Sequence, residues 1–183
     1  ARLAGLVSGE FDFIVNIPAD LEPVVTSYAD ITLVKKSIEN YPMIAFNMLP
    51  LEDRENPLLD ANLRNAIVTA IDRAGIVTAL WGDATYVPVP FNFPEYGSNY
   101  YDANRKARHS FDLAKAKAYL AKSSYKGQVL DWHITRGFYP NYEAAAEIMV
   151  EQWKAAGINI KLSIVDNFGL AYKRPFDLLN MSM

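Results

Sequence analysis

The last third of the chain constrains the fold most, because it switches between the hydrophobic periods of strands and helices. Residues 128–135 and 158–165 are short runs rich in β-branched and apolar residues, which predicts two strands. Between them, a helix is predicted up to residue 156, with Asn141 as its N-cap and Gly157 at its end. Its inward positions follow helical spacing: Ala145, Ile148, Met149, Gln152 and Trp153. Such a βαβ unit predicts two parallel, neighbouring strands joined right-handedly.

The first two thirds predict more strands and helices, without an internal repeat. Further strands are expected at 11–17, 32–34 and 42–47. Helices are expected at 2–7, 21–28, 60–73, 74–81 and 112–122. Asp60 and Asp112 are the expected N-caps of two of these helices, and Gly82 the expected end of a third. Residues 87–102, rich in Pro, Phe and Tyr, predict a long ordered loop. The fold class is therefore α/β (α+β), with a mixed sheet flanked by helices.

Composition limits the classes of partner. A chain of 183 residues fits one ordinary domain or one lobe and can bury a sizeable core. With 18 basic against 21 acidic residues and no clustered basic residues, no nucleic-acid partner is expected. The short basic run 105–109 is interpreted as a solvated loop. No apolar run is long enough to span a bilayer, so no membrane insertion is expected.

Both ends of the sequence look like cuts in a longer protein. The chain shows neither an initiator Met nor a signal peptide. Residues 176–183 stop within an apolar, strand-like run, where natural domains seldom end.

No constellation for catalysis or metal binding stands out. There is no Cys, which excludes a thiolate metal site and a Cys nucleophile. His109 and His133 lie far apart, and neither has a ligand-type residue at helical spacing, so no metal site is expected. His133 is interpreted as a hydrogen-bonded sheet histidine. Glu143 and Glu147 share a helix face and stay open as an acid–base pair, although a solvated face is the simpler interpretation. The sequence favours a binding protein over an enzyme, with no cofactor.

A binding site is predicted in the loop 135–140, between the first strand of the βαβ unit and its helix. Ligands of open α/β sheets bind outside the carboxyl ends of the strands. Arg136 can hold a carboxylate bidentately, Phe138 and Tyr139 can wall an apolar pocket, and the first-turn amides of the helix add positive charge. Equally open is that Arg136 pairs with a surface acid and the aromatic side chains cover the helix end.

Several short motifs occur in a fixed order along the chain. The most specific is residues 57–73, PLLDANLRNAIVTAIDR, where an aspartate precedes a paired Leu-Arg and a terminal Ala-Ile-Asp-Arg. The others are Gly9–Phe13, Ile44–Asn47, Leu80–Ala84 with Pro88 and Pro90, Phe111–Ala116, Trp153–Ile158 and Phe176–Leu178. In order and spacing, over nearly the whole chain, these motifs resemble the bacterial extracellular solute-binding proteins of family 5.

The resemblance implies a two-lobed clamshell that closes on a peptide, nickel chelate, opine or sugar and docks on an ABC permease. Residues 1–183 would form a single lobe, most of the C-terminal one, with 1–18 as a hinge-proximal segment. The place of action would be the periplasm, or the cell surface for a lipoprotein. Asn47, at the end of a family-like strand, joins Arg136, Phe138 and Tyr139 as a residue expected to face the ligand.

Two points stay open within the resemblance. Met183 stands where many members have Trp, which leaves the ligand class open. The alternatives to an importer receptor are a hydrolase fragment and a sensor or chaperone relative of the same family.

Overall fold

The computed structural model describes residues 2–35, 41–51, 54–82, 87, 89, 92, 94 and 101–182. Most of the predicted loop 87–102, the motif positions Asp83, Ala84, Pro88 and Pro90, and Met183 lie outside these residues. The helices are α1 (Arg2–Val7), α2 (Glu22–Val25), α3 (Ala61–Thr69), α4 (Arg73–Trp81), α5 (Leu113–Ala121), α6 (Tyr142–Ala156) and α7 (Phe168–Ala171). The strands are β1 (Pro42–Phe46), β2 (Leu130–Thr135), β3 (Ile160–Val165) and β4 (Leu178–Ser182). Short 3-10 turns at Ala19–Leu21 and Pro57–Leu59 precede α2 and α3.

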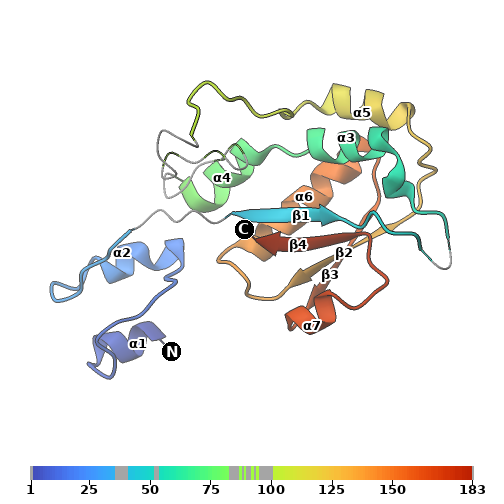
Figure 1. Cartoon of the computed structure of the whole chain (residues 1–183). Coiled ribbons are helices and arrows are strands. Elements are labelled where there is room, and N and C mark those ends of the chain that lie inside the picture. Colours follow the sequence, from blue (N-terminus) through green and yellow to red (C-terminus); the bar gives the residue numbers. More distant parts are fainter. Residues whose placement is uncertain are drawn as a thin grey trace.

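The four strands form one mixed sheet in the order β1-β4-β2-β3. β2 runs parallel to both β3 and β4, whereas β1 runs antiparallel to β4. The predicted βαβ unit is confirmed as β2-α6-β3, and the mixed α/β class with it. β4 lies on the other side of β2 from β3, so the chain returns past β2 after leaving β3 (Figure 1).

The two faces of the sheet carry different layers. Leu130, Trp132 and Ile134 of β2 belong to the buried core that α6 and α3 cover. The ring of Trp132 meets Trp153 of α6 edge-on at 5.1 Å between centroids. Between these core residues, His133 points the opposite way, and its Nδ1 lies 3.0 Å from the carbonyl oxygen of Ala171 in α7. This alternation is what a strand between two layers requires, and His133 is confirmed as a hydrogen-bonded sheet histidine.

Aspartate caps define the outer helices. Asp60 accepts from the Asn62 amide at the start of α3, and Asp112 accepts from the Lys115 amide at the start of α5, both as predicted. The single helix predicted over 60–73 is wrong in its extent, because α3 ends at Thr69. Asp72 instead caps α4 by accepting from the Gly75 amide at 3.0 Å. A short acidic side chain that competes for backbone amides breaks the predicted helix here.

Residues 2–35 form a separate segment, drawn in blue away from the sheet in Figure 1. The strands predicted at 11–17 and 32–34 are wrong, since both stretches are irregular and pair with no strand among the described residues. The helix predicted at 21–28 is reduced to α2. Phe13 is 80% exposed and Val34 79%. A β-prone run becomes a strand only where another strand satisfies its amides and carbonyls.

Candidate functional site

The three parallel strands end at one edge of the sheet, which we call the carboxyl edge. β2, β3 and β4 end there at Thr135, Val165 and Ser182. β1 begins at the same edge, because Pro42 is paired with Ser182. The Arg136 amide donates to the Val165 carbonyl at 2.8 Å, so the β2–β3 ladder continues into the predicted binding loop. The loop therefore leaves the sheet from a fixed point.

Glu143, in the first turn of α6, organises the loop after β2. One carboxylate oxygen accepts from the Gly137 amide at 3.0 Å, and the other lies 3.3 Å from Nη1 of Arg136. Arg136 Nε lies 3.3 Å from Asp166, the first residue after β3. Of the two predicted roles for Arg136, pairing with surface acids is the arrangement seen. Together the three side chains carry one positive and two negative formal charges.

An aromatic cluster lies beside these charges. The ring of Phe138 is 4.4 Å from that of Tyr139 and meets Phe168 of α7 edge-on at 4.9 Å. Tyr139 in turn is 6.4 Å from Tyr142 of α6. Phe138 and Tyr139 are half-buried, and Phe168 is 43% exposed. The cluster therefore joins the β2–α6 loop to α7 and offers an apolar wall at the carboxyl edge.

Buried polar groups lie behind this wall, where β2 and β4 separate. The two strands pair only through Trp132–Leu178 and His133–Leu179. Beyond that point the Thr135 amide donates to Oδ1 of Asn180 at 3.1 Å, so a side chain replaces the main-chain partner. Three of the buried side-chain atoms that have no hydrogen-bond partner in the described part of the chain belong to this region: Thr135 Oγ1, Tyr142 OH and Asn180 Nδ2. Burial, and then the neighbouring Tyr139, raise the pKa of Tyr142 above the ordinary value of a tyrosine.

The start of α6 differs from the prediction in one respect. Asn141 occupies the N-cap position but has a left-handed backbone, with φ of 60°, and its side chain caps nothing. The side-chain Nδ2 of Asn141 donates instead to the Leu80 carbonyl of α4 at 2.8 Å. Asparagine adopts this conformation more readily than most residues, and the contact ties the loop to α4. The predicted cap is therefore wrong, and Glu143 supplies the negative charge near the helix start.

Asn47 lies at the opposite edge from the other predicted site residues. It follows β1, the antiparallel strand, and its amide donates to the Asp177 carbonyl just before β4. The side chain is buried, donating to the Phe176 carbonyl at 2.9 Å and accepting from the Leu49 amide at 3.1 Å. The structure thus brings Arg136, Phe138 and Tyr139 together and separates Asn47 from them.

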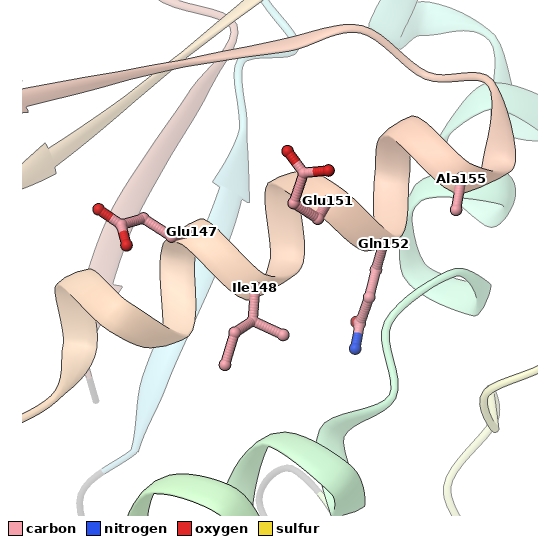
Figure 2. A pocket seen from close by; sticks show the side chains of 5 residues that line it. All are labelled: Glu147, Ile148, Glu151, Gln152 and Ala155. Atoms are coloured by element: carbon pink, nitrogen blue, oxygen red, sulfur yellow. The ribbon is translucent and has the colours of Figure 1, made fainter.

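A shallow groove of about 470 Å³ lies along α6 (Figure 2). Glu147 and Glu151 line it together with Ile148, Gln152 and Ala155. Gln152 was predicted to face the core, but its side chain accepts from the Asp72 amide at 3.0 Å and bridges α6 to α4. Glu147 lines this open groove whereas Glu143 bonds the loop, so the two carboxylates do not converge on one site.

The described residues indicate neither a metal site nor a membrane-spanning helix. No group of three His, Cys, Asp or Glu side chains there is placed to hold a metal ion. In the same part of the chain, no helix combines the length and the apolar character needed to cross a bilayer.

Three contributors to the carboxyl edge were missed by the sequence analysis: Glu143 as an anchor of the loop, and Asp166 and Phe168 after β3. The positions of Asp166 and Phe168 could have been predicted from the sequence. Because β2 and β3 were predicted as parallel neighbours, the residues that follow β3 had to lie beside those that follow β2.

The mixed sheet flanked by helices is the fold of a periplasmic-binding-protein-like lobe, and sequence comparison identifies the family. The profile of the bacterial extracellular solute-binding proteins, family 5 Middle, matches residues 1–183. The chain belongs to this family. It is a family of binding proteins and not of enzymes, as the sequence motifs indicated.

Individual relatives agree with this membership. A probable peptide ABC transporter periplasmic-binding protein, y4tO of Sinorhizobium fredii, is 24% identical over 180 residues, which cover 94% of this chain and 32% of that protein. Lactococcal OppA, solved with an endogenous peptide in the closed conformation, matches with a TM-score of 0.80 at 19% identity, over 99% of this chain and 39% of OppA. NikA of Staphylococcus aureus, solved with Ni(L-His)2, gives 0.73 at 19% identity, over 100% of this chain and 38% of NikA. The chain thus spans about a third of the length of the curated relative.

Proposed function

We propose that this chain is part of the ligand-capturing component of an ABC importer, which binds a peptide or similar small solute and delivers it to a membrane permease. The observation that carries the proposal is the family match over residues 1–183. The similarity to a probable peptide-binding protein of S. fredii favours peptides over nickel chelates as the solute class. Membership of a binding-protein family favours this function over a hydrolase, and the similarity to a probable ABC transporter component favours it over a sensor or chaperone relative of the same family.

In this proposal the lobe comprises residues 41–182, and residues 2–35 are a hinge-side segment longer than the predicted 1–18. The sheet and its layers lie within 41–182. Apolar side chains exposed in the segment 2–35 would be covered by other parts of a protein about three times as long. The transmembrane permease subunits would be partners of that longer protein, in the periplasm or, for a lipoprotein, at the cell surface.

Within the lobe, the carboxyl edge is the proposed ligand-facing surface. Phe138, Tyr139 and Phe168 would contact apolar parts of the solute. Arg136 already lies between two carboxylates, so a ligand carboxylate would have to displace Glu143 or Asp166 to pair with it. Asn47 would support the fold of the lobe and not contact the solute, since both polar atoms of its side chain already bond to the main chain.

The proposal is tested by thermal unfolding of the longer protein with a panel of di- to oligopeptides and, separately, with nickel–histidine. A ligand that binds only the folded state stabilises it, by about 2.7 kcal/mol when its concentration is 100 times Kd. We expect at least one peptide to raise the Tm by several degrees. Absence of any shift across the panel would contradict an importer receptor for peptides, and chromatographic turnover of a peptide would favour the hydrolase.

A further inference from the structure

The largest excess of positive charge in the chain lies in residues 101–126, which we call the basic strip. This strip carries seven Lys and Arg residues against two Asp, a net charge of +5 in a chain whose total is −3. The dense run 105–109 holds only three of these seven cations. Counted over 26 residues, the excess of positive charge is evident.

The cations of the basic strip are exposed and have no acidic partners. All seven are solvent-exposed: Arg105, Lys106, Arg108, Lys115, Lys117, Lys122 and Lys126. None forms an ion pair within the described residues, whereas Lys35, Arg54, Arg136, Lys154 and Lys161 each pair with a carboxylate. The two acids of the strip, Asp102 and Asp112, use their carboxylates to accept from the amides of Asn104 and Lys115. The positive charge is therefore not neutralised locally.

The strip is held on the outer side of the lobe. α5 packs against α3 on the side away from the sheet (Figure 1). Three hydrogen bonds fix it there: Asp112 amide to Thr69 carbonyl at 3.0 Å, Asn62 Nδ2 to Lys122 carbonyl at 3.3 Å, and Ser124 amide to Asp60 at 2.6 Å. Lys115, Lys117 and Lys122 therefore stand on or at the end of a helix that is fixed to the lobe.

The proximity of these charges is also evident at His109. Burial first, and then the positive charges of Arg108, Arg73 and Lys115, lower the pKa of His109 below its ordinary value. Arg73, at the start of α4, is half-buried and donates to the Val68 and Ile71 carbonyls, so it adds to the positive potential near His109 from beneath the surface. Cations from α4, from α5 and from the stretch before α5 thus all lie close enough to His109 to lower its pKa.

We propose that the basic strip adsorbs to an anionic phospholipid bilayer and so orients the lobe on the membrane surface. A set of exposed, unpaired Lys and Arg complements a surface of negative headgroups, each cation adding to the attraction. Phe111, 48% exposed in the middle of the strip, is its one large exposed hydrophobic residue within the described chain. The buried core of a protein–protein interface is depleted of charged residues, whereas a surface of anionic lipid headgroups attracts exposed cations directly.

Co-sedimentation of the purified 183-residue chain with vesicles tests this proposal. We expect binding to vesicles of phosphatidylcholine mixed with phosphatidylglycerol and not to vesicles of phosphatidylcholine alone. High salt should abolish the binding, because it shortens the Debye length to about 3 Å at 1 M. The triple variant Lys115→Gln, Lys117→Gln, Lys122→Gln should lose on the order of a hundredfold in affinity, since each cation contributes about fivefold near a charged membrane.

The matched control changes the same net charge elsewhere. Lys154→Gln, Lys161→Gln, Lys173→Gln removes three exposed lysines outside the strip and should bind within about twofold of the parent chain. Circular dichroism should show both triple variants to be folded, because all six side chains are exposed. Equal loss in the two variants, equal binding to neutral vesicles, or no binding to anionic vesicles would each overturn the proposal.

Discussion

Arg54 Nη2 donates to both carboxylate oxygens of Asp177, at 2.6 and 2.7 Å, and so joins the loop after β1 to the residue that precedes β4. Asp177 is 1% exposed. Its carboxylate also accepts from the Asp131 amide at 2.8 Å, and its carbonyl accepts from the Asn47 amide. One buried acid thus connects β1, β2 and β4 at the edge of the sheet opposite the proposed ligand surface.

Removing Asp177 should therefore destabilise the lobe strongly. Asp177→Ala leaves the Arg54 guanidinium and the Asp131 amide without their partner, and we expect a loss of about 2–4 kcal/mol in the free energy of unfolding. Urea denaturation followed by circular dichroism measures this. Asp166→Ala, at a side chain that is 80% exposed, is the control and should change stability by less than about 0.5 kcal/mol. Equal, small effects of both substitutions would contradict the structural role of Asp177.

Trp153 should be the most sensitive position of the core. Its side chain is fully buried, contacts Trp132, and donates from Nε1 to the Ile67 carbonyl at 2.9 Å. Trp153→Ala should cost about 3–5 kcal/mol. Trp153→Phe keeps much of the volume and loses the hydrogen bond, so a smaller cost of about 1–3 kcal/mol is expected. Lys154→Ala, on the exposed side of the same helix, is the control, and a comparable loss there would argue against this packing.

How far the sequence predicts the fold depends on how local each signal is. β2, α6 and β3 were predicted because their periodicity and the closing Gly157 lie within 38 consecutive residues. The strand predictions at 11–17 and 32–34 failed because β propensity does not supply a partner. Asn47 was grouped with Arg136 because both follow strands, yet only the antiparallel pairing of β1 with β4 places them at opposite edges. Strand direction depends on contacts distant in sequence, which no local pattern contains.

Asp60, the N-cap of α3, should make the free energy of unfolding depend on pH at acidic pH. The hydrogen bond from the Ser124 amide is the main cause that lowers the pKa of Asp60, burial opposes it, and the Asn62 amide lowers it further. Because the pKa in the folded state lies below that of the unfolded chain, about 3.9, the ionised Asp60 stabilises the fold above that pH. This contribution is lost as the pH falls through the folded-state pKa.

Asp60→Asn isolates this effect, because the amide oxygen can still accept from a backbone amide. At pH 7 we expect the variant to be about 0.5–1 kcal/mol less stable than the parent chain. The difference should shrink when urea unfolding is repeated near pH 3. A difference that stays constant between these two pH values would mean that the charge of Asp60 does not contribute.

Asn47→Ala tests whether Asn47 stabilises the fold or contacts the ligand. The change leaves the Phe176 carbonyl and the Leu49 amide without a partner and should cost about 1–3 kcal/mol of stability. In the longer protein we expect the affinity for a peptide, measured at a temperature where the variant is folded, to stay within about threefold of the parent value. A much larger loss of affinity without a loss of stability would indicate that Asn47 contacts the ligand after all.

The most direct measurement is calorimetric titration of the longer protein with a peptide identified by thermal shift, comparing Phe138→Ala, Tyr139→Ala and the parent. If the carboxyl edge faces the ligand, the loss of apolar contact should weaken binding about tenfold or more in each variant. Phe111→Ala, which removes an exposed aromatic side chain on the basic strip, should leave the peptide Kd unchanged. An unchanged Kd in both Phe138 and Tyr139 variants, with the fold intact, would contradict the placement of the binding surface at this edge.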